Sequence, residues 1–274
     1  MQPPEFAGGM APGAERTGRE SGCADPTLDL PRILCLHGGG TNAQIFRAQC
    51  RVIRAHLADS FRLVFADAPF PFQPGPDVTP VYSDWGPFRA WLPRPGIMEL
   101  NVDRIDGCIS AAMRADDQAG ATGQWAGLIG FSQGASLAAS LLLRQQRHNE
   151  SQTSSWGLEC SVKNPSPGYR FAVLFAGRGP LMDMGSFGDN TQFGSDLLRL
   201  PIIHVHGLQD PGIEMHRGLL HCCLKSNTRL VDWDRNHRMP VTTKDVSAVV
   251  AEIQGLTLNL QVADSASKGC CGKY

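Results

Sequence analysis

Short apolar runs alternate along the chain with longer amphipathic stretches. Each run has the length of a buried strand, whereas the stretches between the runs carry apolar residues at helical spacing. This alternation is typical of a doubly wound, mostly parallel sheet with helices on both faces. We expect strands at residues 31–36, 61–66, 125–129, 171–175, 202–205 and 228–231, and helices at 42–57, 97–118, 133–147 and 241–253.

Residues 31–256 are predicted to form one α/β domain, because the pattern shows neither an internal repeat nor a second domain. Residues 1–30 are rich in Gly, Pro and polar side chains and are expected to be a disordered extension. Residues 70–96 are rich in Pro and aromatic residues, and a structureless stretch of this length is usually a lid or binding loop. The polar residues 148–169 are interpreted as a surface insertion, and 257–274 as a tail.

Composition places the chain among globular proteins and excludes several functions. It has 274 residues, 42% of them hydrophobic and 19% charged, and its net charge of −1 offers no basic surface for nucleic acid or anionic lipid. No apolar run approaches the roughly 18–20 residues that cross a bilayer, and the first residues lack an apolar signal sequence. Nine cysteines at irregular spacing do not form a disulfide framework. We therefore expect a cytoplasmic protein without a nucleic-acid partner or a membrane span.

The sequence Gly130-Phe131-Ser132-Gln133-Gly134 lies between a predicted strand and a predicted Ala-rich helix. On its own G-x-S-x-G is a weak pattern, but strand, G-x-S-x-G and helix together form the nucleophile elbow of an α/β-hydrolase. The serine of an elbow has a strained backbone, and the strand and helix around it come so close that the flanking positions exclude a Cβ. Ser132 is the predicted nucleophile.

A nucleophilic serine needs a base and an acid, which follow it in the order Ser, Asp or Glu, His in α/β-hydrolases. Asp210 comes directly after a predicted strand, and His237 lies in the loop after the next strand. Two alternatives stay open: Asp210 precedes Pro211 and could initiate a turn, and His237 could be a solvated loop residue.

Other acids and histidines fit these roles less well. His204 and His206 lie on or beside a strand and are interpreted as structural, whereas His216 and His221 fall on a predicted helix and are interpreted as surface or packing residues. The rival acids, none of which follows a strand at the expected point, are Asp183, Asp189, Asp196 and Asp234.

An oxyanion hole requires two backbone N–H groups, one from the residue after the nucleophile and one from a loop after an early strand. Gln133 supplies the first, and the glycine loop after the first strand supplies the second, with Gly39 preferred and Gly40 as the alternative. As a phosphate-binding loop this segment lacks the required Lys-Ser/Thr pair.

The aromatic residues Trp85, Phe88 and Trp91 of the predicted lid suggest an apolar acyl substrate. The alternative is that they pack the loop onto the domain. The cysteine pairs at 222–223 and 270–271 are adjacent residues and lack the spacing of a zinc site. We expect neither a metal nor a cofactor.

With these residues in place, the chain resembles the FSH family of serine hydrolases, which have the α/β-hydrolase fold. The similarity is to fungal members that serve polyketide pathways, the lovastatin pathway among them, as stand-alone thioesterases. It extends from Ile33 to Pro240 and rests on the segments ILCLHGGGTNAQIFRAQCR, FADAPFP, YSDWGPFRAW, GFSQGASLAA, FAVLFAG, HVHGLQDP and HRMP. It implies a triad of Ser132, Asp210 and His237. One departure is Asn236, where members often have glycine.

The predicted activity is cleavage of an acyl thioester or ester through an acyl-enzyme. The resemblance, and no residue by itself, implies release of a polyketide acyl chain from the acyl carrier protein of a synthase. The alternatives are a broad carboxylesterase acting on small oxyesters and a non-catalytic ligand-binding protein of the same fold.

Overall fold

The computed structural model describes residues 25–76, 78–93, 100–154, 167–185 and 197–269. These residues contain a sheet with the strand order β2-β1-β5-β6-β7-β8, in which every neighbouring pair is parallel. The strands are β1 (Arg32–Leu36), β2 (Arg62–Ala66), β5 (Trp125–Phe131), β6 (Phe171–Phe175), β7 (Ile202–Gly207) and β8 (Thr228–Trp233). This is the doubly wound α/β fold that the alternating pattern predicts.

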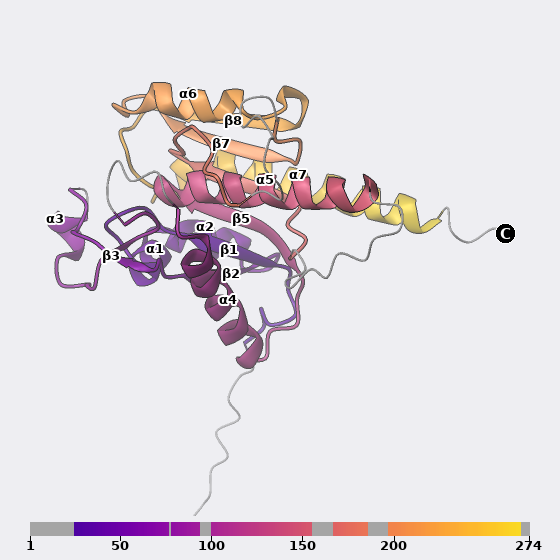
Figure 1. Ribbon diagram of the computed structural model, residues 1–274, viewed down its shortest axis with the longest axis horizontal. Coiled ribbons are helices and arrows are strands. Elements are labelled where there is room, and N and C mark those ends of the chain that lie inside the picture. The colour runs from indigo at the N-terminus through magenta and orange to yellow at the C-terminus, as the bar shows by residue number, and fades with distance from the viewer. Residues whose placement is uncertain (1–24, 77, 94–99, 155–166, 186–196, 270–274) are drawn as a thin grey trace, which may run out of the picture.

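Helices cover both faces of the sheet. One face carries α4 (Val102–Gln118), α5 (Gln133–Ser154) and α6 (Ile213–His221), and the other carries α1 (Ala43–Gln49), α2 (Arg51–Leu57) and α7 (Thr243–Gly269). Figure 1 shows α4 and α5 in front of the sheet and α7 behind it. Each face has its own apolar cluster, with Leu142 and Leu219 in the first and Phe46 and Val249 in the second. Two covered faces explain why β1, β6 and β7 are buried along their whole length.

The neighbouring strands β1 and β5 mark the point where the direction of winding reverses. The helix after β1 packs on one face of the sheet, and α5, which follows β5, packs on the other. The loops that leave the carboxyl ends of these two strands therefore diverge, and ligands of open α/β sheets bind in the resulting crevice. The glycine loop and Ser132 both lie there.

Several elements differ from the predicted ones. The first predicted helix is divided at Cys50 into α1 and α2, so that Phe46 and Ile53 are both completely buried. Strands β5, β7 and β8 each extend two residues beyond their predicted ends. The predicted lid contains structure of its own: β3 (Phe70–Pro71) pairs antiparallel with β4 (Arg89–Ala90), and α3 (Thr79–Tyr82) lies between them.

The boundaries of the predicted extension, insertion and tail also change. Helix α5 extends seven residues beyond 147, and near the predicted end its buried Gln145 and Gln146 hydrogen-bond to residues 169 and 197. Helix α7 continues to Gly269, through most of the predicted tail. Residues 25–30 are ordered against the domain. The remaining parts of these segments, residues 1–24, 94–96, 155–166 and 270–274, lie outside the described residues.

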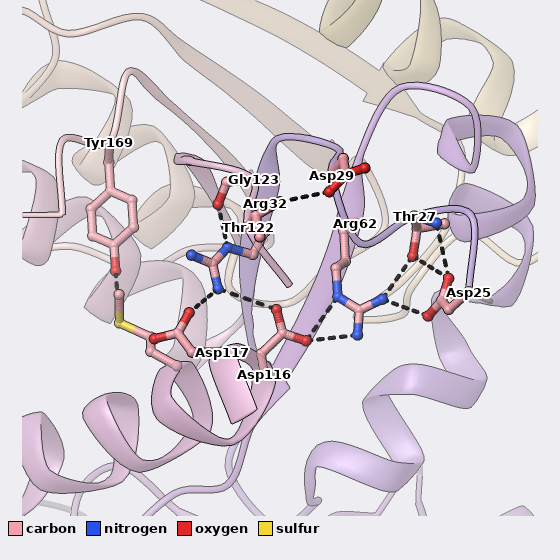
Figure 2. Close-up of polar contacts among 11 residues, drawn as sticks. Asp25, Thr27, Asp29, Arg32, Arg62, Asp116, Asp117, Thr122, Gly123 and Tyr169 are labelled. Atoms are coloured by element: carbon pink, nitrogen blue, oxygen red, sulfur yellow. Dashed lines mark hydrogen bonds and ion pairs between the residues drawn. The ribbon is translucent and has the colours of Figure 1, made fainter. Parts of the chain in front are cut away.

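A network of charged side chains closes the amino edge of the sheet (Figure 2). Arg32 begins β1, Arg62 begins β2, and the buried carboxylate of Asp116 lies between them, 3.4 Å from Arg32 Nη1 and 2.8 Å from Arg62 Nη2. Asp25 contacts Arg62 at 2.6 Å, and the Thr122 hydroxyl donates to Asp29 at 2.6 Å. These contacts tie residues 25–30 to the domain.

The short helix η1 (Lys225–Asn227) completes the described elements. Among the residues described, no helix has the length and apolar character that crossing a membrane requires.

Candidate active site

Ser132 lies in a sharp turn between β5 and α5. Its φ is 52°, in the left-handed region that strains a residue with a side chain. A Cβ at Gly130 would collide with the backbone of Gly134 and Ala135, and a Cβ at Gly134 would collide with the carbonyls that end β1. The strand, the helix and the neighbouring strand therefore meet at van der Waals contact, which only glycine permits at these two positions.

The structure brings Ser132, His237 and Asp210 together in one hydrogen-bonded chain. His237 Nε2 lies 2.9 Å from Ser132 Oγ, and His237 Nδ1 lies 2.5 Å from Asp210 Oδ2. The Asp210 side chain is completely buried, whereas 23% of the His237 side chain is exposed. An imidazole held in this way accepts the serine proton at Nε2 while Nδ1–H donates to the carboxylate.

Two loops at the carboxyl edge carry the acid and the base. Asp210 follows β7, and the loop between β8 and α7 folds across the end of β7. Gly207 permits this approach, because an added Cβ would lie 2.5 Å from the Arg235 carbonyl oxygen and 2.7 Å from that of Asn236. The N–H of Gln209 also donates to the Arg235 oxygen at 3.0 Å. The loop that carries His237 is thereby fixed beside Asp210.

Asp210 is held in its charged form. Burial acts to raise the pKa of this carboxyl, but the Gly212 N–H, which donates to Oδ1 at 2.7 Å, and His237 more than offset that effect. Its pKa therefore lies below the ordinary value. A charged acid keeps His237 in the required tautomer and stabilises the imidazolium that forms when serine loses its proton. The rival acids Asp183 and Asp234 are exposed, and the other two lie outside the described residues.

His216 is a residue that the sequence reasoning missed. Its Nε2 lies 3.3 Å from Asp210 Oδ2, and its side chain is completely buried. Burial lowers its pKa to about 4, so the ring is neutral at pH 7. The spacing contained a signal: His216 is in the first turn of α6, and helical side chains point back toward the preceding turn, which here carries Asp210.

Further buried histidines extend from this position along β7. The rings of His216 and His206 are 5.4 Å apart and those of His206 and His204 are 5.6 Å apart. Burial lowers the pKa of His206 to about 4 and that of His204 to about 3. The prediction that His204 and His206 are structural agrees with this burial, and His204 Nε2 contacts Cys223 Sγ at 3.4 Å.

One group of side chains in the described residues has the composition of a metal site. Asp210, His216 and His237 each offer a ligand atom, and these atoms lie within 4.8 Å of one another. A metal there would displace the hydrogen bond between His237 and Asp210, so metal binding and the triad geometry exclude each other.

The two predicted oxyanion donors are adjacent. A Cβ built on Gly39 would lie 3.5 Å from Gln133 Oε1, and within the described residues neither the Gly39 nor the Gln133 N–H has an acceptor. The alternative donor is wrong, because the Gly40 N–H already donates to the Arg89 carbonyl at 2.9 Å. An oxyanion hole requires two free N–H groups.

The three aromatic residues of the predicted lid have different environments. Trp85 is 38% exposed and Phe88 is partly buried, so both have surface available to a ligand. Trp91 is completely buried within the apolar cluster of β1, α4 and α5, so the expectation that it contacts substrate is wrong. For Trp91 the alternative that it packs the loop onto the domain holds.

Comparison with known proteins agrees with this geometry. The family described as "Serine hydrolase (FSH1)" matches residues 28–249 of the chain. The chain belongs to this family. Membership brings the α/β-hydrolase fold and makes the protein a hydrolase of the serine esterase type.

FSH1-family relatives include proteins from fungi. A "Probable esterase" from Aspergillus terreus (strain NIH 2624 / FGSC A1156) is 66% identical over 256 residues, with 93% of this chain and 96% of the relative covered. "Probable esterase afoC" from Emericella nidulans is 52% identical, with 85% and 92% covered. The crystal structure of esterase PE8 is similar in fold, with a TM-score of 0.54, 16% identity, and 85% and 95% of the two chains covered.

Proposed function

We propose that Ser132, His237 and Asp210 are the catalytic triad of this hydrolase. The observation that carries the proposal is the unbroken chain of hydrogen bonds from Ser132 Oγ through His237 to the buried Asp210. Ser132 Oγ attacks the acyl carbonyl carbon while His237 Nε2 takes the serine proton. Asp210 accepts the hydrogen bond from Nδ1 and stabilises the imidazolium.

The N–H groups of Gly39 and Gln133 hold the oxyanion of the tetrahedral intermediate. Both are without an acceptor in the described part of the chain, and Gln133 begins α5, whose N-terminus favours negative charge. Collapse of the intermediate releases the alcohol or thiol, which receives the proton from His237, and leaves the acyl group on Ser132. Water then attacks the acyl-enzyme with His237 as base, and the acid product leaves.

The proposed substrate is an apolar acyl group bound as a thioester to a carrier protein, with a polyketide as the acyl chain. Support comes from the resemblance to fungal polyketide thioesterases and from apolar surface on the segments that border the site. Val81 and Trp85 are 68% and 38% exposed, and Leu208 and Met215 are exposed beside Asp210 and His216. Free thiols on the five cysteines described support a reducing compartment, the cytoplasm, as part of the proposal.

A carboxylesterase acting on small oxyesters is the second candidate, favoured by the names of the relatives, which are called esterases. The triad serves both substrates. A thiolate leaves with less help from a proton than an alkoxide does, and His237 can supply a proton to either. The triad therefore does not distinguish a thioesterase from a carboxylesterase.

The triad is tested with Ser132→Ala. We expect kcat/KM to fall by roughly 10⁴-fold or more, because no other group replaces the nucleophile. A fluorophosphonate probe should label the wild type and leave the variant unlabelled. Ser247→Ala, at an exposed serine of α7 whose hydroxyl donates to the Lys244 carbonyl, is the matched control and should keep full activity. Unchanged turnover in Ser132→Ala would overturn the assignment, and an unlabelled wild type would point to a binding protein.

The substrate is tested by presenting one acyl chain as a carrier-protein thioester and as an oxyester. A kcat/KM at least tenfold higher for the thioester supports the proposal. Equal values favour the carboxylesterase.

A further inference from the structure

The buried residue Trp91 hydrogen-bonds both to His37, which begins the glycine loop, and to the side chain of Gln133. We propose that Trp91 is a positioning residue that aligns the Gly39 N–H and the Gln133 N–H for the oxyanion. The inference rests on the proposed function and deepens it. It assigns a role in transition-state stabilisation to a side chain that does not touch substrate.

Three hydrogen bonds fasten residues 89–91 to the glycine loop. The Gly40 N–H donates to the Arg89 carbonyl at 2.9 Å, and the Arg89 N–H donates to the Thr41 carbonyl at 2.7 Å. The Trp91 indole N–H donates to the His37 carbonyl at 2.8 Å. The loop is therefore held at both of its ends by one short segment of the predicted lid.

Trp91 is also fastened to the residue after the nucleophile. Its backbone N–H donates to Gln133 Oε1 at 2.6 Å, and the next N–H, of Leu92, points to the same oxygen at 3.4 Å. Trp91 thus bonds to His37 through its indole and to Gln133 through its backbone. One residue bridges the two sides of the oxyanion hole.

The orientation of the Gly39 N–H follows from the other contacts of His37. The Ala68 N–H donates to His37 Nε2 at 3.0 Å, so the proton of this neutral ring is on Nδ1, which donates to the Gly38 carbonyl at 2.7 Å. The Thr41 hydroxyl donates to the same carbonyl at 3.0 Å. In a trans peptide the N–H points opposite to the C=O. Fixing the Gly38 oxygen therefore fixes the Gly39 N–H.

Fastening from outside is needed because Gly38, Gly39 and Gly40 have little resistance of their own to rotation of the backbone. The Trp91 indole bond is buried, so water does not replace it when it is lost. A glycine loop released at the His37 carbonyl would keep its fold, but His37, whose ring holds the Gly38 carbonyl, would be free to shift, and the Gly39 N–H would lose its alignment. The effect should appear in the transition state rather than in substrate binding.

The test is Trp91→Phe, which keeps an aromatic ring in the core and removes the indole N–H. Loss of one oxyanion donor lowers kcat about 10²- to 10³-fold. A misaligned donor should lose only part of its stabilisation of the oxyanion. We therefore expect kcat to fall about tenfold while KM stays within twofold of the wild-type value. The Ki of an alkyl trifluoromethyl ketone, whose hemiketal oxygen stands in for the oxyanion, should rise by the same factor. The control is Trp125→Phe at the opposite end of β5, which should leave kcat and Ki unchanged.

A second variant, Gln133→Met, keeps the length of the side chain and removes the acceptor for the Trp91 N–H. It should show the same pattern of lowered kcat and raised Ki, even if Trp91→Phe fails to fold. Wild-type kcat in either folded variant, or a loss of kcat without a change in Ki, would overturn the inference. These outcomes are separate from failure of the proposed function, which Ser132→Ala decides.

Discussion

The two edges of the sheet carry polar networks of opposite character. At the amino edge, Arg32, Arg62 and Asp116 are joined to one another (Figure 2). At the carboxyl edge, the Gly39 and Gln133 N–H groups have no acceptor within the described residues. Ser132 is strained there as well.

The network at the amino edge serves stability, whereas the groups at the carboxyl edge serve function. Buried polar groups normally have partners, so two backbone donors that lack an acceptor beside the elbow mark a place where a ligand can supply one. At the amino edge, the charges of Arg32, Arg62 and Asp116 are paired with one another. Changes at the two edges should therefore affect different quantities.

The largest effect is expected at the carboxyl edge, from Asp210→Asn. The amide no longer holds His237 in the required tautomer, and kcat should fall about 10³- to 10⁴-fold while the midpoint of thermal unfolding changes little. Steady-state kinetics and calorimetry measure the two quantities. Asp234→Asn, at an exposed rival acid, is the control and should keep its kcat. A small loss in Asp210→Asn would remove Asp210 from the triad.

The amino edge should show the reverse behaviour in Asp116→Ala. Removing this buried carboxylate takes the shared partner from two largely buried guanidinium groups, which keep Asp117 and Asp25 respectively, and the free energy of unfolding should fall by about 1.5–3 kcal/mol. The kcat of the folded fraction should stay at the wild-type value. Asp25→Ala removes a half-exposed partner of Arg62 and should cost less than about 1 kcal/mol. If Asp116→Ala lowered kcat while stability stayed constant, the division between the edges would be wrong.

A smaller effect per residue is expected from acid. Burial lowers the pKa of His206 and of His216 to about 4 from the ordinary 6.5, and lowers that of His204 to about 3. At a pH between the unfolded pKa of 6.5 and the folded pKa of about 4, the unfolded chain binds protons that the folded chain does not. The contribution of these histidines to the free energy of unfolding is therefore complete above about pH 6.5 and is lost as the pH falls toward 4.

Urea unfolding at pH 7 and pH 5 measures this loss, which should be on the order of 2 kcal/mol for each buried histidine. His204→Leu removes one of these groups and should reduce the difference between the two pH values. Equal stability of the wild type at both values would mean that the histidines are not buried in neutral form.

The pattern of the sequence predicted most of the fold, because the signals for strands and helices are local. The apolar runs predicted as strands at 171–175 and 31–36 each match a strand, the second of which begins one residue later than predicted. It failed where distant contacts outweigh local composition: the polar residues from 148 onward suggested a surface insertion, yet α5 continues to Ser154, and the buried Gln145 and Gln146 near the predicted helix end hydrogen-bond to other segments. Aromatic content suggested that Trp91 binds substrate, although it is a core residue.

By itself the sequence determined the elbow at Ser132 and the chain order in which Asp210 and His237 follow it, because the glycines and strand ends that mark these positions lie within a few residues of them. Only the tertiary structure decided that His216 lies against Asp210, that Gly40 is unavailable as a donor and that Trp91 joins His37 to Gln133. The bonds of Trp91 connect residues 54 and 42 positions apart. Such pairings depend on how loops from separate strands meet at one edge of the sheet, and no local pattern encodes that meeting.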